Sequence, residues 1–268
     1  MVGARRSSVR TKRAAKTRLA TLLFASVCLL AGLTRLSWAD PGFGPGEEAV
    51  FNISYGVISA GEGTLSVMPY LDYDGSHCYH FRTRARSNRF FSAIFRVRDQ
   101  ADSFMDSDSL VTRYFNKHLR EGSFRRDVEI HFDQKHNKAY FPDGRVNEIA
   151  PDTQDVLSAF FKVRAMKLEV GMEFDVPTHG DKEMYPLKVK VLRRETIDND
   201  ALGKIDCVVV QPFLADDGLF KHEGDLLLWM SDDERHIPVR MRANVPVGAI
   251  EANLISYTPP SSPAADGK

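Results

Sequence analysis

The side chains best suited to binding chemistry are basic and alternate along one short segment. His80, Arg82, Arg84 and Arg86 are two residues apart. On a β-strand this spacing projects all four side chains from one face. Arginine makes forked contacts with carboxylates and phosphates, so the stripe predicts a groove for an anionic head group, such as that of a phospholipid or an acidic glycan. The alternative is a solvated face whose arginines pair with acids on neighbouring strands.

Two further groups extend the predicted ligand site. Arg240 and Arg242 alternate on another expected strand and form a second basic pair. Phe90, Phe91 and Phe95 form an aromatic cluster, which suits a lid over an apolar ligand. The alternative for such a cluster is ordinary hydrophobic core.

The sequence holds no recognisable catalytic constellation, because both a Gly-x-Ser-x-Gly elbow and a His-Glu-x-x-His zinc motif are missing. The acidic run 232–234 is either a carboxylate pair for acid–base work or a tight turn, and turn preferences favour the turn. Cys78 and His80 would share a strand face, but two ligands make a weak metal site. We therefore expect no catalytic residues, no metal and no cofactor.

The first 39 residues have the order of a secretory signal peptide. Basic residues run to Arg18, an uncharged apolar stretch covers 19–33, and Ser37-Trp38-Ala39 supplies small residues at a cleavage site. We expect cleavage after Ala39 and a periplasmic protein. The apolar stretch is shorter than the ~20 residues that span a bilayer, so we predict no transmembrane span after cleavage; the alternative is a retained anchor.

Removal of this segment changes the charge of the chain. Residues 1–39 hold eight of the 36 basic residues and none of the 36 acidic ones, which leaves 28 against 36 and a net charge of −8. Such an acidic chain is a poor candidate for nucleic-acid binding. Cys78 and Cys207 also remain, and an oxidising compartment permits a disulfide between them. The alternative is two buried thiols.

Alternation of apolar and polar residues with period two dominates the chain. It is clear at 51–57, 127–133, 187–191 and 237–245, and it predicts strands with one buried face. The apolar runs 207–210 and 226–230 predict strands covered on both faces. We count twelve or thirteen strands at short spacing, which implies antiparallel connections. The expected turns are 59–63, 74–75, 143–144, 198–200 and 216–218.

One segment, 151–164, has apolar residues at helical spacing, with Asp152 or Thr153 as the expected N-cap. The predicted fold is therefore mostly β: a single large curved antiparallel sheet, or a half-open barrel, with one capping helix at about 152–164. We expect a flexible segment at 40–48, a single β domain at 49–258 and a disordered tail at 259–268.

A signature near the C-terminus resembles that of DUF3108, a family of exported bacterial proteins of unknown function. In this chain it consists of Trp229, Ser231, Asp232, Asp233, Arg235 and Pro238. The resemblance runs from about Val50 to Tyr257 and implies export, but it implies no activity.

Three hypotheses about function follow. We favour an exported, non-catalytic periplasmic binding or carrier protein for an apolar or amphipathic, lipid-like envelope ligand. The alternative is a structural module of the envelope that binds a protein or a glycan. The third is a hydrolase that uses Asp232 and Asp233. An apolar cavity on the concave side of the sheet favours the first hypothesis, and a filled concave side favours the second. The expected partner is a lipid or an anionic envelope component, and the oligomeric state stays open.

Overall fold

A computed structural model describes residues 41–213, 226–244 and 248–261. The predicted signal peptide, the predicted turn at 216–218 and residues 262–268 of the predicted tail lie outside these ranges. These described residues belong to one compact unit. Within the described part, no helix is both long enough and apolar enough to cross a membrane.

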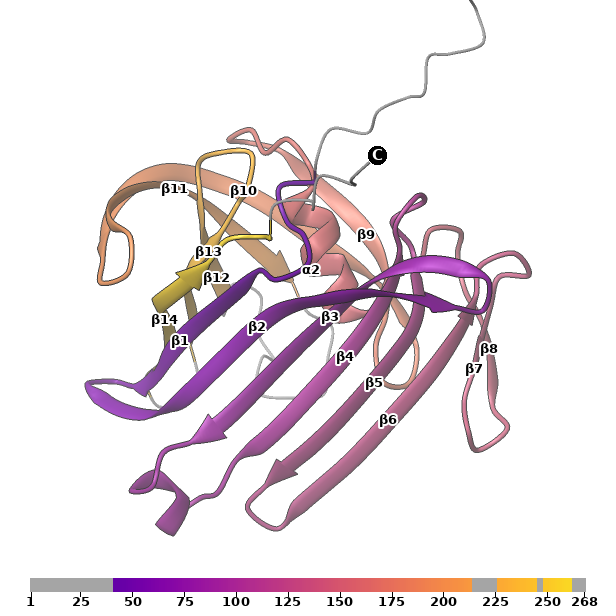
Figure 1. Ribbon diagram of the computed structural model, residues 1–268, viewed down its shortest axis with the longest axis horizontal. Helices are drawn as coiled ribbons and strands as arrows, with labels where there is room; N and C mark the ends of the chain where they lie inside the picture. Colours follow the sequence, from indigo (N-terminus) through magenta and orange to yellow (C-terminus); the bar gives the residue numbers. More distant parts are fainter. Residues whose placement is uncertain (1–40, 214–225, 245–247, 262–268) are drawn as a thin grey trace, which may run out of the picture. The chain divides into compact units, whose positions relative to one another are not determined.

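The described residues form one antiparallel sheet of 14 strands, in the order β8-β7-β6-β5-β4-β3-β2-β1-β14-β13-β12-β11-β10-β9 (Figure 1). Neighbours in this order are mostly neighbours in the sequence, so short hairpins make most of the connections. The strands are β1 (Glu48–Tyr55), β2 (Ile58–Tyr73), β3 (Ser76–Ser87), β4 (Arg98–Asp106), β5 (Thr112–Glu121), β6 (Phe124–Asp133), β7 (Lys138–Tyr140), β8 (Val146–Glu148), β9 (Glu173–His179), β10 (Met184–Asn199), β11 (Gly203–Phe213), β12 (Leu226–Ser231), β13 (Pro238–Asn244) and β14 (Ala249–Thr258).

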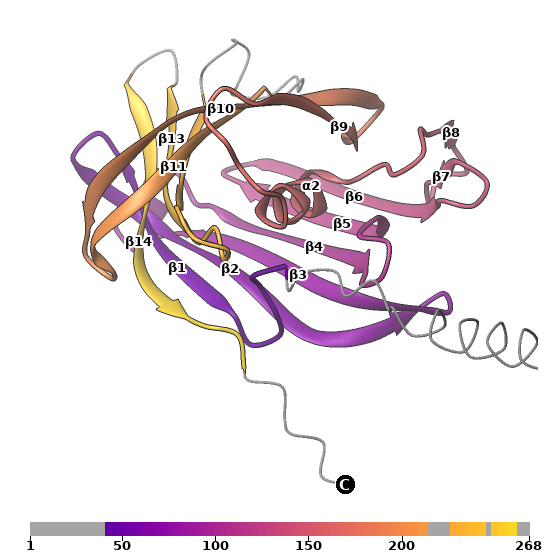
Figure 2. The same ribbon diagram turned by 90° about the horizontal axis from the view of Figure 1, so that it is seen from above.

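The sheet curls around the helix α2 (Val156–Arg164), which lies between β4–β6 and β9–β11 (Figure 2). Its two ends approach one another. Asn147 on β8 donates to the carbonyl oxygen of Lys182 at 2.8 Å, and its Nδ2 lies 3.1 Å from Nε2 of His179 on β9. Gln154 forms a parallel bridge with Thr178. The fold is thus the predicted curved sheet, nearly closed, with one helix on its concave side.

The helix begins later than we expected. Its N-cap is Asp155, whose carboxylate accepts hydrogen bonds from the backbone N–H groups of Leu157 at 2.7 Å and Ser158 at 3.0 Å. The hydroxyl of Ser158 accepts in turn from the backbone N–H of Asp155, which completes a capping box. The prediction of Asp152 or Thr153 was wrong, since Asp152 has a left-handed backbone (φ 60°) outside the helix.

The cap also ties the helix to the sheet. Asp155 is buried and accepts hydrogen bonds from Ser103 on β4 at 2.6 Å and from Thr112 on β5 at 2.9 Å. Burial raises the pKa of Asp155 although these bonds oppose the rise. The same groups therefore start the helix and fix its position over β4 and β5.

Aromatic stacking continues this contact toward β3. The rings of Phe81 on β3 and Phe161 on α2 are stacked, with centroids 3.6 Å apart and planes 7° apart. Phe43 packs edge-on against both rings, and Glu47 is buried beside it in the same N-terminal segment. The glycines and prolines of 40–48 had suggested flexibility, and the burial of Phe43 and Glu47 corrects that expectation for residues 41–48.

The first hairpin differs from the prediction for a steric reason. Its turn lies at Gly56 and Val57, between β1 and β2, and residues 59–63 belong to β2. Gly61 is needed because a Cβ there would lie 2.2 Å from the carbonyl oxygen of Arg86 on β3. The glycines that indicated a turn instead permit close approach of two strands.

Candidate functional site: an apolar groove under the helix

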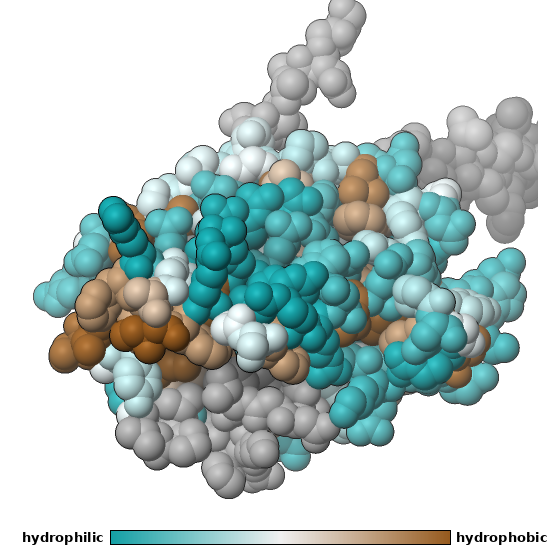
Figure 3. Space-filling view, turned by 90° about the horizontal axis from the view of Figure 1, so that it is seen from below, coloured by the Kyte–Doolittle hydropathy of each residue, from teal (hydrophilic) through white to brown (hydrophobic). Residues whose placement is uncertain are grey.

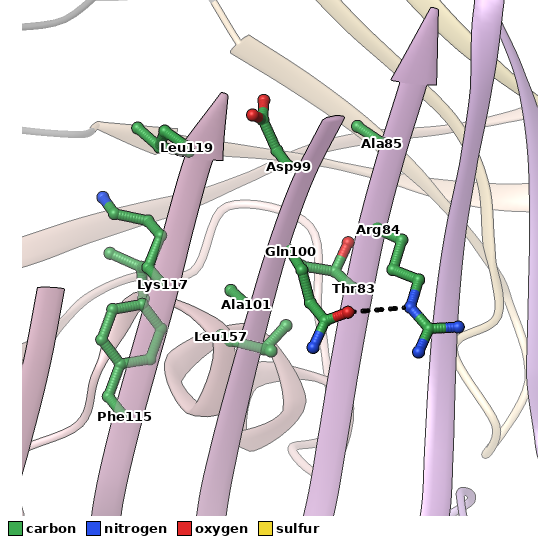
Figure 4. A pocket seen from close by; sticks show the side chains of 11 residues that line it. Thr83, Arg84, Ala85, Asp99, Gln100, Ala101, Phe115, Lys117, Leu119 and Leu157 are labelled. Atoms are coloured by element: carbon green, nitrogen blue, oxygen red, sulfur yellow. Dashed lines mark hydrogen bonds between the residues drawn. The ribbon is translucent and has the colours of Figure 1, made fainter. Parts of the chain in front are cut away.

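A cavity of about 260 Å³ lies between the concave face of β3–β5 and the start of α2 (Figure 4). The sheet side chains around it come from alternate positions, such as Thr83 and Ala85 on β3 and Phe115 on β5. Leu157 contributes the helix side. A hydrophobic wall therefore meets a hydrophobic helix face without filling the space between them.

A second cavity of about 230 Å³ continues along the concave face toward β13 and β14. It shares Thr83, Ala85 and Leu157 with the first, and it is also lined by Phe160 on α2 and Met241 on β13. We call the two adjoining cavities the concave groove.

Small residues create this space. Ala85, Ala101 and Gly63 occupy sheet positions under the helix where larger side chains would fill the groove. A Cβ on Gly63 would lie 3.2 Å from Cδ1 of Ile53. The predicted site contained none of these residues, because small residues on an apolar strand face carry no chemical signature of their own. The available signal was the alternation of small residues with the arginines of β3.

Two charged side chains border the groove on its β4–β5 side (Figure 4). Asp99 accepts a hydrogen bond from the backbone N–H of Arg120 at 2.8 Å. The ammonium group of Lys117 lies 2.6 Å from Oδ1 of Asp181 in the β9–β10 turn, and Arg126 reaches Oδ2 of the same carboxylate at 3.0 Å. The groove thus has apolar walls and a charged border.

The predicted basic stripe lies on the opposite, convex face of β3. His80 Nε2 is 2.7 Å from Oδ1 of Asp102, and Arg82 donates to the same oxygen at 2.6 Å. Burial raises the pKa of Asp102, but hydrogen bonds from His80, Gln100 and Arg82 outweigh it and lower the pKa to about 2. Arg84 donates to Gln100 at 3.0 Å. His80 and Arg82 therefore bond to an acid on the neighbouring strand, as the alternative interpretation supposed for the arginines, whereas Arg84 bonds to an amide.

The second basic pair is distant from the stripe. The register aligns Arg240 on β13 with Arg86 on β3, four strands away, which is about 19 Å at the usual strand spacing of ~4.8 Å. Arg240 donates to Asn253 at 2.8 Å, and Arg242 pairs with Glu251 at 3.2 Å. The structure does not bring the two groups of arginines together in one site.

The aromatic cluster does not cover the groove either. It lies in the β3–β4 connection, where residues Phe91–Ala93 form the short helical turn η1. The Phe90 and Phe95 side chains are 70% and 47% exposed. They are neither core nor part of the groove lining.

The residues of the resemblance build a turn between β12 and β13. The Ser231 hydroxyl donates to Asp233 at 2.7 Å and accepts from the backbone N–H of Ile237 at 2.7 Å. Arg235 donates to both oxygens of the Asp233 carboxylate. Trp229, on β12, is buried, and its indole N–H donates to the carboxylate of Glu195. Pro238 opens β13.

The two aspartates of this turn are engaged separately. Asp232 pairs with Arg194 at 2.7 Å, whereas Asp233 pairs with Arg235. Burial raises the pKa of Asp233, but its hydrogen bonds from Arg235 and Ser231 outweigh burial and lower the pKa. A hydrolytic pair needs one carboxyl of raised pKa facing a cleft, so this arrangement gives the hydrolase hypothesis no support.

The disulfide between Cys78 and Cys207 is not formed. Both thiols are free and buried, and burial raises the pKa of each to about 11. Cys78 is on β3 and Cys207 on β11, with five strands between them in the sheet order. In the described residues, no group of three or more His, Cys, Asp or Glu is placed to hold a metal.

Comparisons with known proteins address the fold and the family. A crystal structure described as a β-barrel-like protein of the domain of unknown function DUF1849, from Brucella abortus, is 12% identical, with a TM-score of 0.53. The match covers 82% of this chain and 99% of that one. It shows a shared fold alone. A DUF1089 family protein from Pseudomonas aeruginosa is 12% identical over 72% of this chain and 92% of that one, with a TM-score of 0.38. No curated protein matches the sequence.

The family comparison covers most of the β domain. Residues 50–255 match the family described as a protein of unknown function (DUF3108). The matched range includes the groove-lining residues, α2 and the whole β12–β13 turn. The chain belongs to the DUF3108 family.

Proposed function

We propose that the protein is an exported, non-catalytic binding or carrier protein of the periplasm, and that it holds a lipid-like ligand in the concave groove. The observation that carries the proposal is the open apolar space between α2 and the concave face of the sheet. An open groove with apolar walls suits an apolar guest.

The size of the groove limits the ligand. The two adjoining cavities measure about 260 and 230 Å³. Ligand pockets usually measure about 300–1,000 Å³. The pair suits one acyl chain or a comparable apolar group, and a multi-chain lipid would leave most of its apolar surface outside.

The border suits an amphipathic ligand. Lys117 has three N–H donors, of which one lies near Asp181. The head group of an amphipathic ligand can accept hydrogen bonds from this ammonium while its tail occupies the apolar walls. The unfilled groove also favours a binding protein over the structural module, for which a filled concave side was expected.

Native mass spectrometry and solvent extraction of purified protein test the proposal directly. We expect a co-purifying amphipathic molecule, or saturable binding of a fluorescent fatty acid when the groove is empty. Ala85→Phe and Ala101→Phe add a ring inside the groove, and each should reduce probe binding at least about tenfold, because the ring occupies the volume of the guest.

Ser66→Phe is the matched control. Ser66 lies on β2 opposite Arg82 in the register, on the convex face, so the same enlargement there should leave probe binding unchanged. Circular dichroism confirms that each variant is folded. If folded protein neither carries a ligand nor binds the probe, or if all three variants bind equally, the carrier proposal fails and the envelope-module alternative gains.

A further inference from the structure

Three chain connections meet at one end of the sheet. They are the β1–β2 turn, the β3–β4 connection and the β5–β6 turn. Asn88 donates from Nδ2 to the carbonyl oxygen of Ser59 at 2.6 Å, and its backbone N–H donates to Ala60 at 2.9 Å. The backbone N–H of Gly122 donates to the backbone carbonyl oxygen of Arg96 at 2.7 Å. We call residues 55–60, 86–98 and 121–125 the hairpin rim.

Apolar side chains project from this rim into solvent. Among the described large hydrophobic residues, the five most exposed all lie on it, and all are at least 50% exposed. They are Val57, Ile58, Phe90, Ile94 and Phe124. Figure 3 views the molecule from this end and shows apolar surface beside strongly hydrophilic side chains. Removal of such a side chain from water is favourable by about 1.5–3 kcal/mol when it becomes fully buried. Binding of a partner at the rim would therefore be favourable.

The hydrophilic part of the rim is positively charged, with five arginines against one acid, Glu121. Residues 86–98 contain four arginines and no acid, although the chain beyond residue 39 is net acidic. Within 41–213, 226–244 and 248–261, these four side chains form no ion pair and no hydrogen bond. They are Arg86, Arg89, Arg96 and Arg98. Arg125 donates only to the backbone carbonyl oxygens of Gly122 and Phe124.

We infer that the hairpin rim docks onto the surface of an anionic phospholipid bilayer. Apolar side chains on separate turns can each enter the boundary between head groups and acyl chains, while unpaired guanidinium groups contact lipid phosphates. Each arginine near an anionic surface is worth about 1 kcal/mol. The net negative charge of the rest of the domain orients the molecule, because it keeps other faces away from the bilayer.

Docking at the rim would also bring the concave groove to the membrane. Ala85, Asp99 and Leu119 line the groove, and the first two are paired one position before the rim pair Arg86 and Arg98. The open border of the groove is therefore adjacent to the proposed membrane contact. The inference goes beyond the proposed function, since a protein can dock on lipid without carrying it.

Flotation of the protein with vesicles tests the inference. We expect binding to vesicles of phosphatidylcholine with about one-third phosphatidylglycerol, weaker binding as salt rises, and little binding to phosphatidylcholine alone. Arg89→Gln/Arg96→Gln should weaken binding about 30-fold, and Phe90→Ser/Ile94→Ser about tenfold or more. The matched controls are Lys135→Gln/Lys204→Gln and Val146→Ser/Val170→Ser, which change exposed residues outside the rim.

Phe90→Trp reports insertion itself. Its emission should shift to the blue on addition of anionic vesicles and should be quenched by brominated acyl chains, while the fluorescent fatty acid assay reports the groove separately. Absence of vesicle binding, equal binding to neutral vesicles, or equal losses in rim and control variants would overturn the inference. Recovery of a specific protein partner through the rim, without any vesicle binding, would also overturn it.

Discussion

The guanidinium of Arg164, in the last turn of α2, donates from Nη2 to Oε1 of Glu47 at 2.8 Å. The two side chains are only 1% and 3% exposed. The same nitrogen donates to the carbonyl oxygen of Arg235 at 2.9 Å, and Nδ1 of His236 lies 2.8 Å from the carbonyl oxygen of Arg164. This buried pair therefore joins the N-terminal segment, the end of the helix and the β12–β13 turn.

Arg164→Met should destabilise the protein by about 3–5 kcal/mol, because it leaves the Glu47 carboxylate buried without its cation. Glu47→Leu/Arg164→Met should lose less than the single variant, since it removes both charges. Urea unfolding followed by circular dichroism measures both. Arg145→Met, which breaks an exposed pair with Asp143, should cost less than about 1 kcal/mol. Equal costs for the two single variants would contradict the prediction.

The sheet was largely predictable because period-two alternation is a local signal. The alternating segments at 127–133 and 187–191 lie within β6 and β10, and the apolar runs 207–210 and 226–230 lie within β11 and β12. The start of the helix was missed although its signal is local. The true cap, Asp155, forms a capping box with Ser158 three residues later, and the bonds from Ser103 and Thr112 add the contact with the sheet.

The groove was harder to predict than the fold. Arg82 and Arg84 attract attention because their chemistry is visible in the sequence, yet Asp102 and Gln100 satisfy them on the convex face. The groove exists because the side chains of Ala85 and Ala101 are small. The empty volume arises only when the helix is placed over the sheet. Period two correctly put the arginines on one face, but it does not say which face is concave.

Asp102 should make stability depend on pH in the acid range. Its pKa is about 2 in the folded protein against a reference of 3.8, so its contribution is complete above about pH 4 and is lost as pH falls toward 2. Asp102→Asn should cost about 2 kcal/mol at pH 6, and the difference from the unmodified protein should shrink on acidification. Urea unfolding at pH 6, 4 and 2.5 measures this.

Asp108→Asn is the control for that series, because it removes an exposed carboxylate near the end of β4. It should change the free energy of unfolding by less than about 0.5 kcal/mol at each pH. A cost of Asp102→Asn that stays constant between pH 6 and 2.5 would mean that the carboxylate is not held ionised by His80, Gln100 and Arg82.

Cys78 and Cys207 should be protected thiols. Both are buried and free, and burial raises the pKa of each to about 11, so little thiolate is present at neutral pH. We expect negligible reaction with a thiol reagent in the folded state and complete reaction in urea. A reducing agent should leave Tm unchanged. Rapid labelling of folded protein, or a mobility shift on non-reducing gels that Cys207→Ala abolishes, would contradict the free-thiol assignment.

Asp181 should act as a clasp between the two ends of the curled sheet. Its carboxylate, 9% exposed, lies 2.6 Å from Lys117 on β5 and 3.0 Å from Arg126 on β6, although Asp181 itself lies in the β9–β10 turn. Asp181→Ala leaves two cations without their anion and should cost about 2–3 kcal/mol. Hydrogen exchange should rise in β8 and β9, where Asn147 meets His179 and Lys182.

The matched variant for the clasp is Asp175→Ala, which removes an exposed carboxylate from β9. It should leave both the free energy of unfolding and the exchange of β8 unchanged. If the clasp holds the groove walls together, Asp181→Ala should also speed dissociation of the fatty acid probe, because separation of the sheet ends widens the exit. Faster exchange in β8 and β9 with unchanged probe dissociation would show that Asp181 stabilises the contact between the sheet ends without closing the groove. Unchanged exchange would show that Asp181 does neither.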